Sequence, residues 1–243
     1  MSAPRFFADV ECAAGAQIEL RRDDAHHAIE VLRMHTGDPL VIVRDGTAWD
    51  ATLNDSGRGR ASALVVAPRA EIGGELPVAV IVLQAIAKGS KFDEVVEKAV
   101  ELGARRIVPV VCERSYAQAS SAKIERWRRI ARSAAQQSRR RYLPEIVDPM
   151  TWMEALRVTN VDRPTLVAYE RASPGSLAAA VDAIADARSI AIAIGPEGGL
   201  TDAEVAAAKE SGGALVSLGP TILRTEAAAP AMLAALAARR GWW

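Results

Sequence analysis

The sequence contains little cysteine and no long apolar run. Its two cysteines, Cys12 and Cys112, lie far apart without the spacing of a CxxC pair or a zinc site, which favours a reduced cytoplasmic setting and no bound metal. The first ten residues lack the apolar core of a secretion signal, and the longest apolar stretches are shorter than a bilayer span. We therefore expect a cytoplasmic protein that has no membrane partner.

Net charge is also absent. The 30 basic residues are matched by 30 acidic ones, so a polyanionic partner would have to be held by local patches. The sequence has neither a GxxxxGK[ST] loop nor a GxGxxG loop after a strand. The sequence therefore lacks the motif that would be the main support for an ordinary P-loop enzyme or a Rossmann-type methyltransferase.

The 243 residues divide into two regions that differ in hydrophobic periodicity. Residues 37–68 hold three short β-rich runs separated by turn signals, which predict a β-meander within a small barrel, preceded by a short helix that ends at Gly37. Residues 69–77 are the best linker candidate. The remainder alternates apolar strands with helices, which predicts an α/β fold whose mostly parallel sheet binds ligands at the carboxyl ends of its strands.

The elements expected in this second region follow from its periodicity. Strands are predicted within 78–87, 106–112, 165–170, 189–194 and 214–219. Helices are predicted at 91–103, 121–138 and 176–187, after Thr201, and from about residue 227 to the C-terminus.

The first of two glycine-rich loops reads IGPEGGLTDAE, residues 194–204. Thr201 and Glu204 have the spacing of a capping box, so the glycines at 195, 198 and 199 lie between a strand end and a helix start. Bare backbone N–H groups there could approach a ligand closely. The alternative is that these glycines only make a tight turn.

The second loop, LGPTILRTEAA at residues 218–228, likewise lies between a predicted strand and a predicted helix. An apolar pair, Ile222 and Leu223, is unusual in a loop and suits packing against a flat apolar ligand such as an adenine. Pro230 fits the first turn of a helix, so Arg224 and Glu226 are expected in the loop or at the cap.

A basic stretch extends from Lys123 to Arg141 and contains eight basic residues against one acid. Trp127 and Ile130 keep one helix face apolar, so the arginines gather on the other face, as a phosphate-binding surface requires. The alternative is an ordinary solvated helix face.

These motifs together resemble the SPOUT methyltransferases, and more narrowly the RsmE family, which methylates N3 of a uridine in small-subunit (16S) ribosomal RNA. The resemblance covers most of the chain, including PRFF at 4–7, HHAIEVLRMHTGD at 26–38, KGSKFDEVVEKAVELG at 88–103 and AAQQSRRRYLPEI at 134–146. It implies a PUA-like β-barrel that binds RNA over residues 1–72, and an α/β domain with a deep trefoil knot over residues 73–243. It also implies a homodimer, S-adenosylmethionine as cofactor, and the 30S subunit or its RNA as partner.

The resemblance further implies roles for individual residues. Arg224 and Glu226 are expected to be catalytic, with Arg224 stabilising charge on the target base and Glu226 the candidate base. The expected cofactor-binding residues are Tyr169, Gly195, Glu197, Gly198, Gly199, Leu218, Gly219, Ile222 and Leu223. The expected RNA-binding residues are Arg5, His27, Arg33, Arg114 and Arg140. Two positions depart from the family pattern: Arg139 stands where a glycine is expected and Ala227 where a threonine is expected.

Alternatives to uridine methylation stay open. A related enzyme of the same fold could methylate a ribose 2′-hydroxyl or guanosine N1, and a non-catalytic RNA-binding dimer could use the second region only to associate. For the dimer, the last helix offers Met232, Leu233 and Leu236 on one apolar face, which could alternatively pack on its own sheet.

Overall fold

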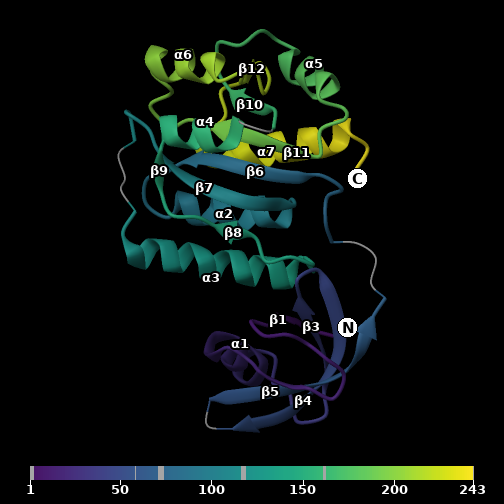
Figure 1. The fold of residues 1–243 in the computed structure, drawn as a ribbon. Helices are drawn as coiled ribbons and strands as arrows, with labels where there is room; N and C mark the ends of the chain where they lie inside the picture. The colour runs from purple at the N-terminus through teal and green to yellow at the C-terminus, as the bar shows by residue number, and fades with distance from the viewer. Residues whose placement is uncertain (1–2, 58, 71–73, 116–118, 161–162, 243) are drawn as a thin grey trace. The chain divides into compact units, whose positions relative to one another are not determined.

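The computed structural model describes residues 3–57, 59–70, 74–115, 119–160 and 163–242. The chain divides into two compact units, coloured along the chain in Figure 1. The N-terminal unit comprises Met1–Glu75 and Ala135–Leu143, and the C-terminal unit comprises Leu76–Ala134 and Pro144–Trp243. The boundary expected between residues 72 and 73 lies outside the described residues. No pattern in the sequence predicts that 135–143 returns to the N-terminal unit.

The N-terminal unit is built on a five-stranded sheet. Its strand order is β1 (Arg5–Phe7), β3 (Pro39–Arg44), β4 (Thr47–Gly57), β5 (Arg60–Arg69) and β2 (Gln17–Glu19), with only β1 and β3 parallel. Asp45 and Gly46, both with positive φ, form the two-residue turn that joins β3 to β4, as the predicted meander requires. Phe6, Ile42 and Leu53 are buried in the core of this unit.

The helix of the N-terminal unit is shorter than the sequence predicts. α1 (Arg22–His26) continues as a π-helical turn, η1 (His27–Val31), and does not extend to Gly37. Arg33 adopts a left-handed φ of 54°, and the N–H of Met34 donates to the carbonyl of Ala28 at 3.0 Å. The helix therefore ends where the chain turns to bury Met34.

The C-terminal unit contains a parallel sheet. Its order is β12 (Ala214–Val216), β10 (Thr165–Ala168), β11 (Ser189–Ile194), β6 (Ala79–Ala85), β7 (Ala104–Val111) and β8 (Glu145–Ile146), while β9 (Met150–Thr151) pairs with β7. β6 is apolar apart from Gln84, because helices cover both faces of the sheet. The two-residue strands β8 and β9 have no periodicity that the sequence could reveal.

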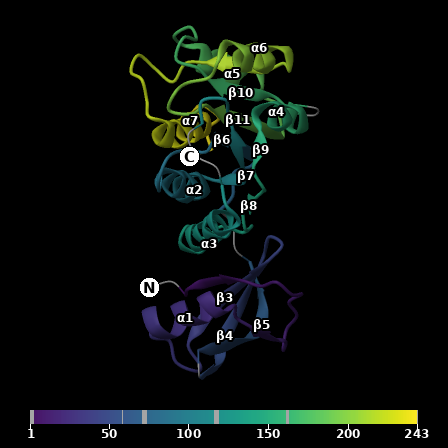
Figure 2. The same cartoon turned by 90° about the vertical axis from the view of Figure 1, so that its left-hand side faces the viewer.

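Helices pack on both faces of this sheet (Figures 1 and 2). α4 (Trp152–Asn160) and α6 (Asp202–Glu210) share a buried cluster on one face, and α2 (Lys91–Glu101), α5 (Ser176–Ala183) and α7 (Thr225–Arg239) pack together on the other. The sequence missed α4, whose Trp152 is buried and donates its indole N–H to the carbonyl of Glu204 at 3.0 Å.

α3 (Ser121–Gln137) packs on α2 through its apolar face. The rings of Trp127 and Phe92 lie 4.2 Å apart between centroids. Asp93 of α2 accepts hydrogen bonds from the indole of Trp127 at 3.0 Å and from Nε of Arg126 at 2.8 Å. The predicted division of this helix into an apolar and a basic face is therefore present, but an acid of α2 pairs with one of its arginines.

α7 corrects two expectations. It begins at Thr225 rather than near residue 227, so Pro230 lies inside the helix and cannot donate a hydrogen bond to the carbonyl of Glu226. Met232, Leu233 and Leu236 are fully buried within this single chain, because α7 packs on α2 and the sheet. The proposal that this face lies in a dimer interface is therefore wrong.

Candidate functional site

A pocket of about 580 Å³ opens in the C-terminal unit at the carboxyl ends of β10, β11 and β12. Because these strands are parallel, the segments that follow them meet at the same edge of the sheet. The pocket brings together all nine expected cofactor-binding residues, together with Arg224: Tyr169, Gly195, Glu197, Gly198, Gly199, Leu218, Gly219, Ile222 and Leu223. Lys91, at the start of α2, also lines it.

Hydrogen bonds hold the loop after β11 at its turn and at the start of the helix that follows. The N–H of Gly199 donates to the carbonyl of Pro196 at 2.9 Å, and Gly199 has a positive φ of 72°, which makes the turn tight. The capping box predicted for Thr201 and Glu204 is confirmed. The other carboxylate oxygen of Glu204 accepts the N–H of Glu113 at 2.9 Å, which ties the helix start to the segment after β7.

The glycines of this loop make room for protein atoms as well as for a ligand. A Cβ on Gly195 would come within 2.9 Å of Cγ of Leu200, and a Cβ on Gly198 within 3.1 Å of Cβ of Arg114. Gly219, in the other loop, has a φ of 126° and no atom within 4 Å of its missing Cβ. A close approach to a ligand is expected of Gly195, Gly198 and Gly199. At Gly195 and Gly198 the nearest atoms to the missing Cβ belong to the chain itself, and at Gly199 only Oε1 of Glu170, among the described residues, lies within 4 Å, at 3.7 Å.

The loop after β12 forms an apolar wall of the pocket. Ile222 is 86% exposed, and Leu218 and Leu223 also line the pocket. Apolar walls beside bare glycine backbone match the flat ring and polar edge of an adenine, and the volume is that of a small-molecule site. The apolar walls and glycine backbone of the pocket therefore fit the cofactor that the sequence resemblance implies.

A buried polar chain joins the two loops to the sheet. The hydroxyl of Thr225 donates to the carbonyl of Gly195 at 2.8 Å and accepts a hydrogen bond of 2.9 Å from the amide of Gln84. Gln84, near the carboxyl end of β6, is fully buried and also donates to the carbonyl of Ala85. Sequence reasoning missed this residue, although a lone amide in an otherwise apolar run was the available signal.

The expected catalytic pair lies where α7 begins. Arg224 is exposed and lines the pocket, whereas Glu226 lies beside the pocket rather than in its wall. One carboxylate oxygen of Glu226 is 3.2 Å from Nζ of Lys91 and 4.0 Å from the guanidinium of Arg224. Burial raises the pKa of Glu226, but the N–H of its own backbone, Lys91 and Arg224 lower it, and the net pKa is below its usual value. A lowered pKa disfavours proton acceptance by Glu226.

Among the described residues, neither Cys112 nor a cluster of metal-ligand side chains marks a second reactive centre. Burial, with Glu204 nearby, raises the pKa of the Cys112 thiol far above its usual value, so this thiol stays protonated. Among the residues that the structure describes, no group of three or more His, Cys, Asp or Glu side chains could hold a metal ion. No helix in the same part of the chain is long and apolar enough to cross a bilayer.

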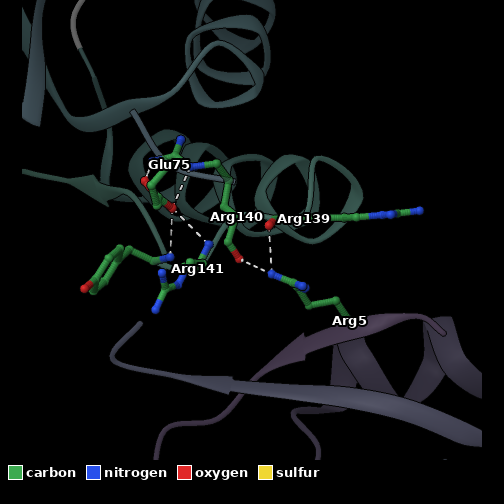
Figure 3. Close-up of polar contacts among 6 residues, drawn as sticks. Arg5, Glu75, Arg139, Arg140 and Arg141 are labelled. Atoms are coloured by element: carbon green, nitrogen blue, oxygen red, sulfur yellow. Dashed lines mark hydrogen bonds and ion pairs between the residues drawn. The ribbon is translucent and has the colours of Figure 1, made fainter. Parts of the chain in front are cut away.

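Two of the expected RNA-binding residues, Arg5 and Arg140, are buried in the N-terminal unit (Figure 3). Glu75 accepts two hydrogen bonds from the guanidinium of Arg140, at 2.9 and 2.7 Å, and further ones from the N–H groups of Arg141 and Tyr142. Arg5 donates to the carbonyls of Arg139 and Arg140 at 2.7 and 2.9 Å. Both side chains thus hold the returning segment 135–143, and neither is exposed to a phosphate.

Arg139, which stands where the family pattern has a glycine, has an unusual backbone conformation. Arg139 has a left-handed φ of 57°, a conformation that a glycine adopts without strain, which accounts for the glycine expected there. Opposite it, a Cβ on Gly74 would come within 2.3 Å of the carbonyl oxygen of Arg139. The backbone is therefore closely packed on the inner side of this turn.

The other three expected RNA-binding residues are exposed. His27 and Arg33 lie on the surface of the N-terminal unit. Arg114, in the C-terminal unit, donates to the carbonyl of Gly198 at 3.1 Å, so it borders the loop after β11. These exposed positions are compatible with the predicted RNA contacts, which remain predictions.

Neighbouring acids reduce the charge excess of the basic stretch. Arg126 pairs with Asp93, and Arg128 pairs with Glu125 at 2.6 Å and Asp148 at 3.0 Å. Arg132 and Arg140 are buried. The local excess counted along the sequence therefore overstates the positive charge that this helix presents.

Two family models match consecutive parts of the chain, and the second match includes the returning segment 135–143. Residues 20–66 match the model of the RNA methyltransferase PUA domain, and residues 74–237 match that of the RNA methyltransferase domain. The ribosomal RNA small subunit methyltransferase E of Bacillus subtilis is 35% identical over 216 residues, which cover 85% of this chain and 84% of that protein. The chain belongs to the ribosomal RNA small subunit methyltransferase E family.

Solved structures support this membership of the methyltransferase E family. The ribosomal RNA small subunit methyltransferase E of Neisseria gonorrhoeae, bound to S-adenosyl methionine, is 30% identical with a TM-score of 0.86, and the match covers 100% of this chain and 98% of that one. A putative methyltransferase of Legionella pneumophila, in complex with the cofactor SAM, is 27% identical with a TM-score of 0.89 over 98% of both chains.

Proposed function

We propose that the protein methylates N3 of a uridine in small-subunit (16S) ribosomal RNA on the assembled subunit, with S-adenosylmethionine as methyl donor. The observation that carries this proposal is the pocket at the ends of β10, β11 and β12, whose lining includes every expected cofactor-binding residue. Relatives that share most of the chain are named ribosomal RNA small subunit methyltransferases. A ribosomal target also supports a cytoplasmic location.

For methyl transfer to N3, the protein needs to position the two reactants and to stabilise the negative charge that develops on the base. When bound, S-adenosylmethionine supplies an electrophilic methyl group. This methyl group bonds to N3 as the N3 proton is lost, and the electron pair of the broken carbon–sulfur bond stays on sulfur. Loss of that proton spreads negative charge onto the two carbonyl oxygens that flank N3. Arg224 offers fixed positive charge at the pocket, and as a guanidinium it stays protonated.

Analysis of nucleosides from ribosomal RNA tests the substrate. Small-subunit RNA from a deletion strain should lack one 3-methyluridine, and purified protein with S-adenosylmethionine should restore it on isolated 30S subunits. A lost ribose 2′-O-methyl group or 1-methylguanosine would identify a related enzyme instead. If no nucleoside changes and calorimetry detects no cofactor binding, the non-catalytic RNA-binding dimer is favoured.

We also propose the trefoil knot and the homodimer that the family resemblance implies. β12 is an edge strand, yet the chain returns from it past the loop after β11 to pack α7 on β6, a path that supports a threaded connection. The outer face of α7, with Ala227, Ala231, Ala234 and Ala238 at least partly exposed, would allow close approach of a second copy. Light scattering should give twice the 25.9 kDa chain mass, and the mass of one chain would refute the dimer.

A further inference from the structure

We propose that Lys91 is a second cation of the catalytic centre, held in place by Glu226, and that it stabilises negative charge on a carbonyl oxygen of the target uridine. This inference rests on the proposed uridine N3 methylation. The observations that support it are the position of Lys91 in the pocket wall and its 3.2 Å ion pair with Glu226.

Lys91 reaches the pocket from a different element than Arg224 does. It is the first residue of α2, whereas Arg224 immediately precedes α7, and α2 packs against α7. The side chain of Lys91 is 35% exposed, so it is partly buried where it lines the pocket. Two cations from two packed helices therefore converge on one oxygen of Glu226 beside the pocket.

Glu226 is poorly placed to accept the N3 proton. One of its oxygens is held by Lys91, and the other is buried with no hydrogen-bond donor among the described residues. Neither oxygen belongs to the pocket wall. The carboxylate therefore acts on the reaction through Lys91, as a positioning residue, and the N3 proton leaves to hydroxide in the solvent, which becomes water.

The charge pattern of the pocket favours the uridine over the cofactor as the partner of Lys91. The sulfonium of S-adenosylmethionine is positive, so Lys91 and Arg224 repel it, whereas a uridine that has lost its N3 proton is an anion with one carbonyl oxygen on each side of N3. Two separate cations can thus stabilise the two oxygens at once.

Lys91→Met tests the role of Lys91 directly, and Lys98→Met is its matched control. Lys98 lies on the same helix, is paired with Glu97 and Glu101, and lies outside the pocket wall. Single-turnover methylation of 30S subunits by Lys91→Met should slow about 100-fold, the loss typical of one removed charge-stabilising donor. Calorimetry should give a cofactor Kd within twofold of the wild type, Lys91→Arg should restore most of the rate, and Lys98→Met should react normally.

The pH dependence separates charge stabilisation from a structural role. A cation beside the base lowers the pH at which N3 loses its proton, so Lys91→Met should move the rising limb of the pH–rate profile to higher pH. Besides Lys91, the charged residues of the pocket wall are Glu170, Glu197 and Arg224; Glu226 pairs with Lys91, and the backbone N–H of Lys88 donates to Glu197. Glu226→Gln should lose less rate than Lys91→Met, and the double variant should be no slower than Lys91→Met alone.

Three results would overturn the inference. The first is a wild-type rate in Lys91→Met while the wild type makes 3-methyluridine. The second is a cofactor Kd that rises more than tenfold in Lys91→Met, together with loss of the preference of the wild type for S-adenosylmethionine over its decarboxylated analogue, because Lys91 would then bind the cofactor carboxylate. The third is a double variant far slower than either single one. If the wild type makes no 3-methyluridine at all, the proposed function fails and the inference fails with it.

Discussion

At the scale of single residues, the structure separates arginines that bind protein from arginines that can bind RNA. Arg140 matches a family motif, yet its side chain is 2% exposed and makes a bidentate pair with Glu75. A motif identifies a residue type and its position, but the exposure of the side chain depends on segments far away in the sequence. Here that segment is the end of the region before β6, which supplies Glu75.

Glu75→Gln should destabilise the N-terminal unit. The substitution removes the negative charge that compensates buried Arg140, and loss of one partner of a buried pair costs about 3–5 kcal/mol. Hydrogen–deuterium exchange should speed up in β1 and in residues 135–142. Glu19→Gln on the exposed side of β2 is the control and should exchange like the wild type. Unchanged protection in Glu75→Gln would mean that the ion pair contributes little.

Gly198→Ala should weaken cofactor binding by crowding Arg114. A Cβ at this position would lie 3.1 Å from Cβ of Arg114, and overpacking typically costs about 1–3 kcal/mol. Calorimetry with S-adenosylmethionine measures the loss. Arg114→Gly in the same background removes the opposing atom and should recover most of the affinity. If the double variant binds as weakly as Gly198→Ala, the added methyl group obstructs the ligand itself.

At the scale of elements, the sequence predicts best what is local and strongly patterned. The apolar runs of β6 and β11, the stop of α2 before Gly103, and the cap at Thr201 each depend on neighbouring residues, and each is present in the structure. Parallel strands then bring both glycine-rich loops to one edge, so the pocket could be predicted from the sequence.

Other elements could not be predicted, for physical reasons. β8 and β9 are too short for periodicity, and the return of 135–143 depends on Glu75, which is 65 residues before Arg140. Gln84 is conspicuous as a lone amide in an apolar strand, but its partner Thr225 lies 141 residues later in the chain and could not be predicted. Contacts of this range leave no local pattern in the sequence.

The hydrogen bonds of Thr225 should couple the sheet to the loop after β11. Thr225→Val keeps the shape of the side chain but leaves the carbonyl of Gly195 and the amide of Gln84 each without one bond. Such buried losses cost about 1–3 kcal/mol. In a double-mutant cycle with Gln84→Leu, measured by urea unfolding, the coupling free energy should be about 0.5–3 kcal/mol. Strict additivity of the two losses would contradict the coupling.

At the scale of the whole molecule, a neutral chain must attract a polyanion through local charge. Acids of the C-terminal unit neutralise Arg126 and Arg128 on α3, so these side chains add little to the field that a phosphate meets. Lys123 and Arg129, on the same helix, make no ion pair among the described residues. Their charges are therefore the ones that the helix can offer to RNA.

Removal of these two charges should reduce the salt dependence of RNA binding. Each phosphate contact that is lost lowers the slope of log K against log salt concentration by about 0.7–0.9, so Lys123→Gln with Arg129→Gln should reduce it by about 1.4–1.8. Filter binding to small-subunit RNA at several potassium concentrations gives the slope. Lys98→Gln, which removes a cation already paired with two glutamates, should leave the slope unchanged. If the double variant and the wild type have equal slopes while Arg33→Gln reduces it, RNA is held by the N-terminal unit and not by this helix.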